Sequence, residues 1–235
     1  MRAFGDVWRS NIFQKWVMAL TGLLLVLFLI GHLSGNLLIF LGPEHMNEYG
    51  RSLRTMVHGA AIWLVRGGLL LVFVLHVWSA IRLTQRNRAA RPEKYVKVDT
   101  RTSTMASRSM ALSGLLLLVY ALYHLAHFTW GTAHSQFYAG QTGWEYALAD
   151  GTIVPDVYRM VLASFHEPLI TAIYILAMVL LGLHLNHAVA SAFQTLGVTN
   201  KRLVPVIRLV GPILGIGVAI GFCSVPLSII AGLVH

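Results

Sequence analysis

The sequence predicts an all-α integral membrane protein that crosses the bilayer with five transmembrane helices. Of its 235 residues, 56% are hydrophobic and 11% are charged, whereas an ordinary soluble domain carries about 25% charged residues. The apolar residues form five continuous runs, each longer than the ~20 residues that an α-helix needs to span a bilayer. Because polar and apolar residues do not alternate in these runs, the pattern favours helices over the strands of a membrane barrel.

The five predicted helices follow one another with short polar breaks. The first continues far past Lys15, beyond the length of a signal peptide, and is expected to be retained. The second ends at a basic segment that starts near Arg82, and the third follows that segment. The fourth is entered through residues 165–168, and the fifth follows Lys201 and Arg202. The expected ranges, in a single domain covering 1–235, are about 12–41, 60–83, 105–130, 162–196 and 203–234.

The distribution of basic residues predicts the orientation of these helices. The chain carries 18 Lys and Arg residues and a formal net charge of +9. Most of them lie before the first helix and in the loops after the second and fourth, which is typical of the cytoplasmic side of a membrane rather than of nucleic-acid binding. We expect a multi-pass protein of a bacterial cytoplasmic membrane, with the N-terminus cytoplasmic, the C-terminus outside, and an external loop at about 134–164.

The single cysteine, Cys223, limits the cofactors that the chain could hold. One thiol cannot form an internal disulfide, a Cys-ligated zinc site or a Cys-bound iron–sulfur cluster. The sequence also has no CxxCH motif, so any haem must be bound without a covalent link.

The first and third predicted helices share an internal repeat. Met18-Ala-Leu-Thr-Gly-Leu-Leu-Leu leads to His32, and Met110-Ala-Leu-Ser-Gly-Leu-Leu-Leu leads to His124. The interval from Met to His is 14 residues in both stretches. Because both helices are expected to run from inside to outside, the two histidines are predicted to lie at the same depth.

Six of the eleven histidines fall within the apolar helices, where ionisable groups are costly and usually functional. They are His32, His76, His124, His127, His184 and His187. At 1.5 Å per residue, the first and third of these lie roughly 25 Å from the inner boundary. His76 and His187 precede the inner ends of their helices and belong to the inner half. Depth therefore predicts an outer pair, His32 with His124, and an inner pair, His76 with His187.

Two pairs of histidines at two depths favour two haems b, each held by two axial imidazoles in a bundle of the first four helices. Zinc is less favoured, because it prefers tighter clusters with carboxylate or thiolate ligands. For any single histidine, a hydrogen bond between helices is the simpler interpretation. Arg66, a charged residue inside the second helix, suits a haem propionate, or its side chain extends to the outer interface.

Over its first four helices, the chain resembles the five-helix, dihaem cytochrome b membrane subunit of succinate dehydrogenase and fumarate reductase (succinate:menaquinone oxidoreductase). The stretches that carry this resemblance are 15–22, 31–36, 63–66, 75–76, 107–110, 124–125, 184–187 and 191–197. In that family the four haem ligands come from the first four helices. The resemblance places them at His32, His76, His124 and one of His184 or His187.

The family motif favours His187, which is followed by a small residue before Ser191-Ala-Phe-Gln. His184 is then the alternate ligand, and His127 a neighbour of the haem or another alternate. The carboxylate that some members place near an outer quinone site has only three candidates here, Glu44, Glu48 and Glu167. The sequence therefore leaves the quinone site unlocated.

The resemblance implies a membrane anchor that passes electrons but does not itself oxidise succinate. A flavoprotein (FAD) subunit and an iron–sulfur subunit are the implied partners, and menaquinone is the implied acceptor, as in the respiratory chain and the tricarboxylic acid cycle. The basic inner loop, 82–108, is a candidate docking surface, and the assembled complex is a candidate for higher oligomers. Two other functions remain open: the cytochrome b anchor of a hydrogenase or formate dehydrogenase, and a haem-free anchor or transporter.

Overall fold

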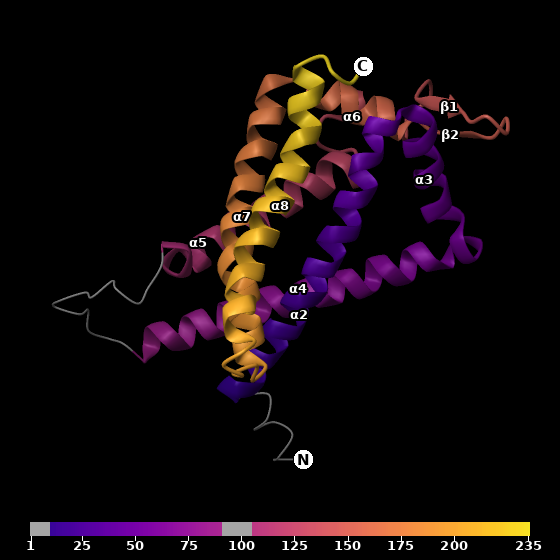
Figure 1. Cartoon of the computed structure of the whole chain (residues 1–235). Helices are drawn as coiled ribbons and strands as arrows, with labels where there is room; N and C mark the ends of the chain where they lie inside the picture. Colours follow the sequence, from indigo (N-terminus) through magenta and orange to yellow (C-terminus); the bar gives the residue numbers. More distant parts are fainter. Residues whose placement is uncertain (1–9, 91–104) are drawn as a thin grey trace.

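The computed structural model describes residues 10–90 and 105–235, and its regular structure is almost entirely helical. The long helices are α2 (Asn11–Asn36), α4 (Ala60–Ala89), α5 (Met105–His124), α7 (Pro168–Thr195) and α8 (Val204–Ile230) (Figure 1). The shorter elements are η1 (Leu37–Leu41), α3 (Pro43–Thr55), η2 (Met56–Gly59), the π-helical segment η3 (Leu125–Thr129), η4 (Ser135–Phe137), β1 (Glu145–Ala147), β2 (Ile153–Pro155) and α6 (Val157–Phe165).

Within the described residues, five helices are long and apolar enough to cross a membrane. The predicted class, an all-α multi-pass membrane protein, is confirmed at this level. Four of the five predicted ranges match the observed helices closely, except that α4 continues to Ala89 through its basic end. The basic residues of the chain that lie outside the described part are Arg2, Arg9, Arg91, Lys94, Lys97 and Arg101.

The fourth predicted helix is two helices in the structure. We expected one segment over about 162–196, but α6 ends at Phe165 and α7 begins at Pro168. Glu167 has an extended backbone, with φ −82° and ψ 113°. Proline restricts the residue before it to extended conformations and is well accommodated at the first position of a helix. The break therefore follows from Pro168.

The segments α3, β1, β2 and α6 form a lobe at one end of the molecule, which we call the α3–α6 lobe (Figure 1). Buried Asn47 and Asp156 join its helices: the Asn47 amide donates to the Asp156 carboxylate at 3.0 Å, and Asn47 Oδ1 accepts from the backbone of Tyr158. Hydrogen bonds from Thr152 and the guanidinium of Arg51 lower the pKa of Asp150 to about 2. The predicted external loop is therefore an ordered structure.

Helices α7 and α8 lie side by side with glycines at their contact (Figure 1). A Cβ atom on Gly215 would meet the carbonyl oxygen of Gly182, and one on Gly211 would meet that of Asn186. Gly211 and Gly215 are spaced i, i+4, so they face the same side of α8. Small residues at this spacing allow membrane helices to approach closely.

Helix α4 has a different relation to the other helices. It packs mainly on α2 and is steeply inclined to α7 and α8 (Figure 1). Many of its apolar side chains are exposed, Leu64 by 76% and Leu70 by 61%. Large exposed apolar surface on a long helix is what a lipid environment requires.

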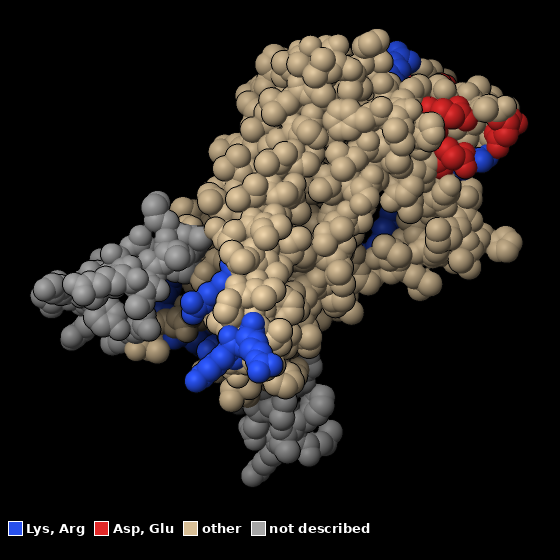
Figure 2. All heavy atoms as spheres, in the orientation of Figure 1, with Lys and Arg blue, Asp and Glu red and all other residues tan. Residues whose placement is uncertain are grey.

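The two ends of the molecule differ in charge. Basic atoms gather where α2 begins and α7 passes into α8, and acidic atoms gather over the α3–α6 lobe (Figure 2). Arg86, near the basic end of α4, donates to Asn11 at the start of α2 at 2.6 Å. The asymmetry expected from the loop composition is thus present in three dimensions among the described residues.

Candidate cofactor site

The structure brings together the two histidines that the repeat placed at equal depth. His32 on α2 and His124 on α5 have ring centroids 5.8 Å apart, with an angle of 80° between the ring planes. The two residues are therefore close enough for His32 and His124 to hold one haem iron together through their imidazoles.

Aromatic rings surround the His32–His124 pair. Phe28 stacks on His32 at 5.4 Å, and Phe222 of α8 lies 5.7 Å from the same ring. Phe128 lies 5.6 Å from the His124 ring, edge to face. An apolar and aromatic shell suits a flat hydrophobic macrocycle and leaves the imidazoles as its polar contacts.

His127, one turn beyond His124, has both ring nitrogens occupied by protein partners. Nδ1 lies 3.0 Å from the hydroxyl of Tyr174, and Nε2 lies 3.0 Å from that of Ser164. The side chain is 2% exposed. Binding a metal would break one of these buried hydrogen bonds, so His127 is suited to joining α5, α6 and α7 rather than to ligation.

His76 and His184 each contact a residue of the internal repeat that the first and third predicted helices share. His76 on α4 contacts Thr21 of α2, with 3.2 Å between Nδ1 and the hydroxyl, and its ring lies over Gly22. His184 on α7 makes the same kind of contact with Ser113 of α5, at 3.0 Å. Its ring lies over Gly114. The two Thr/Ser-Gly pairs of the repeat therefore each hold a histidine from a neighbouring helix.

Each of these contacts engages the Nδ1 atom of its histidine. The Thr21 hydroxyl donates to the carbonyl of Val17 at 2.6 Å, and the Ser113 hydroxyl donates to that of Met110 at 3.2 Å. A hydroxyl that keeps its proton within its own helix can accept from the histidine Nδ1–H. With Nδ1 engaged by Thr21 or Ser113, Nε2 is the nitrogen through which His76 or His184 would bind a metal.

The inner pair expected from depth was His76 with His187. His184, the alternate, is the α7 residue with the contact equivalent to that of His76, and it lies within electrostatic range of both His76 and His187. His187 is partly buried one turn nearer the end of α7. Depth alone could not distinguish these two residues, because they lie on one face of the same helix.

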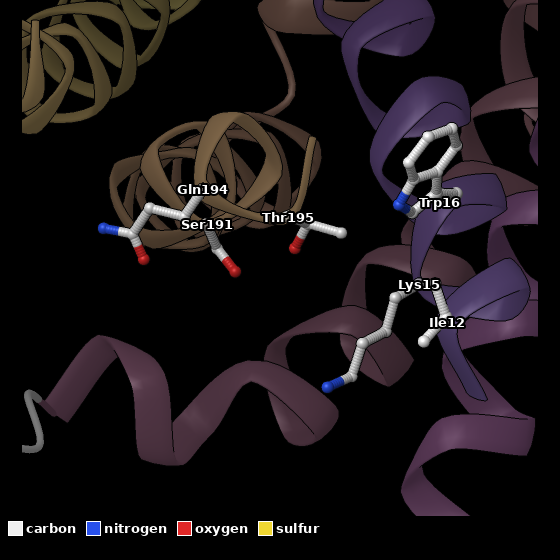
Figure 3. A pocket seen from close by; sticks show the side chains of 6 residues that line it. All are labelled: Ile12, Lys15, Trp16, Ser191, Gln194 and Thr195. Carbon is white, nitrogen blue, oxygen red and sulfur yellow. The ribbon is translucent and has the colours of Figure 1, made fainter. Parts of the chain in front are cut away.

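A cavity of about 340 Å³ at the basic end brings together two stretches that carried the family resemblance. It lies between the start of α2 and the end of α7 (Figure 3). Lys15 and Trp16 line it from α2, and Ser191, Gln194 and Thr195 line it from α7. The sequence did not predict this pairing, because the two stretches are far apart along the chain.

Two of the three carboxylates proposed as quinone-site candidates, Glu44 and Glu48, have partners in the protein. Glu44 accepts from the backbone of Ala149 at 2.9 Å, and Glu48 pairs with Arg51 at 2.8 Å, both in the α3–α6 lobe. Within the described residues, no group of three or more His, Cys, Asp or Glu side chains is placed to hold a metal ion. A haem site needs only two such ligands, so the histidine pairs are the relevant groups.

No family model, no curated protein and no solved structure matches this chain.

Proposed function

We propose that this chain is the cytochrome b membrane subunit of a succinate:quinone oxidoreductase, which passes electrons through two haems b to menaquinone. The observation that carries the proposal is the His32–His124 pair at 5.8 Å between two long apolar helices. His32 and His124 would hold a haem iron between two imidazoles, and a haem held in this way would supply electron transfer rather than oxygen binding. Succinate is inferred as the donor from the family resemblance, and electron transfer is inferred from the geometry of the histidines.

In this proposal the outer haem is held by His32 and His124 and the inner haem by His76 and His184. His184 takes the place first given to His187 because its Nδ1 contacts the Ser113 hydroxyl in the same way as His76 Nδ1 contacts the Thr21 hydroxyl. The helices supply ligands at two depths, so that electrons entering at one face can reach the other. When bound, the haems would supply the one-electron chemistry, and the chain would orient them and adjust their potentials.

The basic end of the molecule is the proposed cytoplasmic face, where the flavoprotein and iron–sulfur subunits would dock. The exposed basic side chains Lys201 and Arg202 and the basic end of α4 support this orientation. The α3–α6 lobe then lies outside a bacterial cytoplasmic membrane. The cavity that includes Lys15 would lie directly beneath the docking subunits, on the side of the inner histidines.

The first test is a haem measurement on the protein purified from its membrane. We expect a b-type spectrum and two haems per chain by the pyridine haemochrome method. His32→Gln and His124→Gln should each remove one haem, and His76→Gln and His184→Gln should each remove the other. His187→Gln and the exposed control His45→Gln should keep both haems. Loss of the same haem from the His32 and His76 variants would contradict the pairing, and a colourless wild-type protein would contradict the function.

The second test identifies the donor. We expect the purified complex to reduce its haems when succinate is added, and a menaquinone analogue to reoxidise them. Reduction by hydrogen or formate, with no response to succinate, would instead assign the chain to another quinone-linked dehydrogenase. The histidine assignments would remain valid in that case.

A further inference from the structure

A second cavity, of about 300 Å³, lies between the α3–α6 lobe and the long helices. Arg54 from the end of α3 and Arg66 from α4 both line it, together with Phe128, Tyr138 and Met160. The sequence singled out Arg66 but gave no reason to associate Arg54 with it, because the turn between α3 and α4 separates them. In Figure 2, basic atoms are visible in a hollow of the surface below the acidic side chains.

The described residues that line this cavity include two guanidiniums and no carboxylate. Arg51, on the same helix as Arg54, differs in having carboxylate partners: it pairs with Glu48 at 2.8 Å and with Asp150 at 2.6 Å. The Arg66 guanidinium lies 5.1 Å over the ring of Trp63, a contact that leaves its charge uncompensated. Two like charges on one cavity favour an anionic ligand.

The cavity is next to the outer histidine pair. Phe128, which lines it, lies 5.6 Å from the His124 ring and stacks on His127 at 4.0 Å. The carbonyl of Met160, another lining residue, accepts from the Ser164 hydroxyl that contacts His127. Phe128 therefore lines the cavity of the two guanidiniums and also contacts His124, one of the two proposed ligands of the outer haem.

We propose that Arg54 and Arg66 bind the two propionate carboxylates of the outer haem. This inference rests on the proposed function. A guanidinium binds a carboxylate through two parallel hydrogen bonds, and two guanidiniums match two propionates. A neutral quinone would need no such charge. Arg54 would also couple the α3–α6 lobe to the haem, since α3 belongs to that lobe.

The test compares the reduction potentials of the two haems in Arg54→Gln and Arg66→Gln variants of the purified complex. Loss of a positive charge near a haem disfavours its reduced form, so the outer haem should become harder to reduce. We expect about a tenfold change in its reduction equilibrium, or about 59 mV for one electron. The inner haem should be unaffected. Arg51→Gln, which removes a paired arginine from the same helix, should change neither potential.

Arg54→Lys and Arg66→Lys provide a second readout if a Gln variant is poorly assembled. Because lysine keeps the positive charge, the reduction potential of the outer haem should shift from its wild-type value by only a small fraction of the shift in the Gln variants. Unchanged potentials in all four variants, with both haems present, would overturn this inference and leave the proposed function standing. Restoration of wild-type behaviour by added anionic lipid would also overturn it, because the anion would then be a lipid headgroup. A wild-type protein without haem would overturn the function itself.

Discussion

At the scale of single residues, the most informative feature is the contact between a side-chain hydroxyl and a histidine ring, which occurs for Thr21 with His76 and for Ser113 with His184. Thr21 and Ser113 each donate inside their own helix and contact the Nδ1 atom of a histidine on another helix. A partner on Nδ1 raises the basicity of a metal-bound imidazole and holds its ring in place. Both residues are therefore proposed as positioning residues, although neither would touch the haem iron.

Thr21→Val should raise the reduction potential of the inner haem, because valine keeps the shape of threonine and removes the acceptor. A hydrogen bond of this kind contributes about 1 kcal/mol, which corresponds to several-fold in the reduction equilibrium. Ser113→Ala should act on the same haem in the same direction. Redox titration followed at the haem absorbance measures the shift. Thr21→Ser, which keeps the hydroxyl, is the matched control, and an equal shift in that variant would argue against the hydrogen bond.

His127 shows how a buried histidine in an apolar segment can be held by protein partners at both ring nitrogens. It belongs to the same apolar run as His124, and periodicity alone places it near the same site. Its two hydrogen bonds, to Tyr174 and Ser164, account for both nitrogens. The sequence could not reveal these partners, because they come from α7 and α6.

At the scale of elements, the packing of α7 on α8 depends on glycine. The glycines Gly182, Gly211 and Gly215 have backbone atoms where a side chain would have to fit. The sequence contains the Gly-x3-Gly spacing of 211 and 215, but it does not identify the helix that packs against it. Gly217 lies on the same helix with open space around it, and it provides a direct comparison.

Gly215→Leu should destabilise the pairing of α7 with α8, because the new side chain would meet the backbone of Gly182. Overpacking of this kind costs about 1–3 kcal/mol, and we expect a lower midpoint of thermal unfolding in detergent micelles. Gly217→Leu should leave the midpoint nearly unchanged. If both variants unfold at the same temperature, close packing at Gly215 does not contribute to stability.

At the scale of the whole molecule, the charge asymmetry and the odd number of spans predict that the termini lie on opposite sides of the membrane. Cys223 is the only cysteine, so a Cys223→Ser background allows single cysteines to be placed at either end. With a membrane-impermeant thiol reagent on intact cells, Gly232→Cys should be labelled and Ser10→Cys should not. The opposite pattern would reverse the proposed orientation, and labelling of both would contradict an odd number of spans.

Composition and run length were sufficient for the membrane class and the five long helices. These properties depend on one helix at a time, and a helix has a fixed rise per residue. The division between α6 and α7 was also readable at Pro168, but the continuous apolar pattern masked it. His32 and His124, which the repeat predicts at equal depth, lie in contact in the structure.

The partners of these helices depend on how each helix is rotated and which neighbour it meets, and a sequence of apolar residues carries little of that information. Lipid-facing and helix-facing positions are both apolar, so periodicity does not distinguish them. For this reason the contact of His184 with Ser113, the two hydrogen bonds of His127 and the meeting of Arg54 with Arg66 became visible only when the helices were assembled.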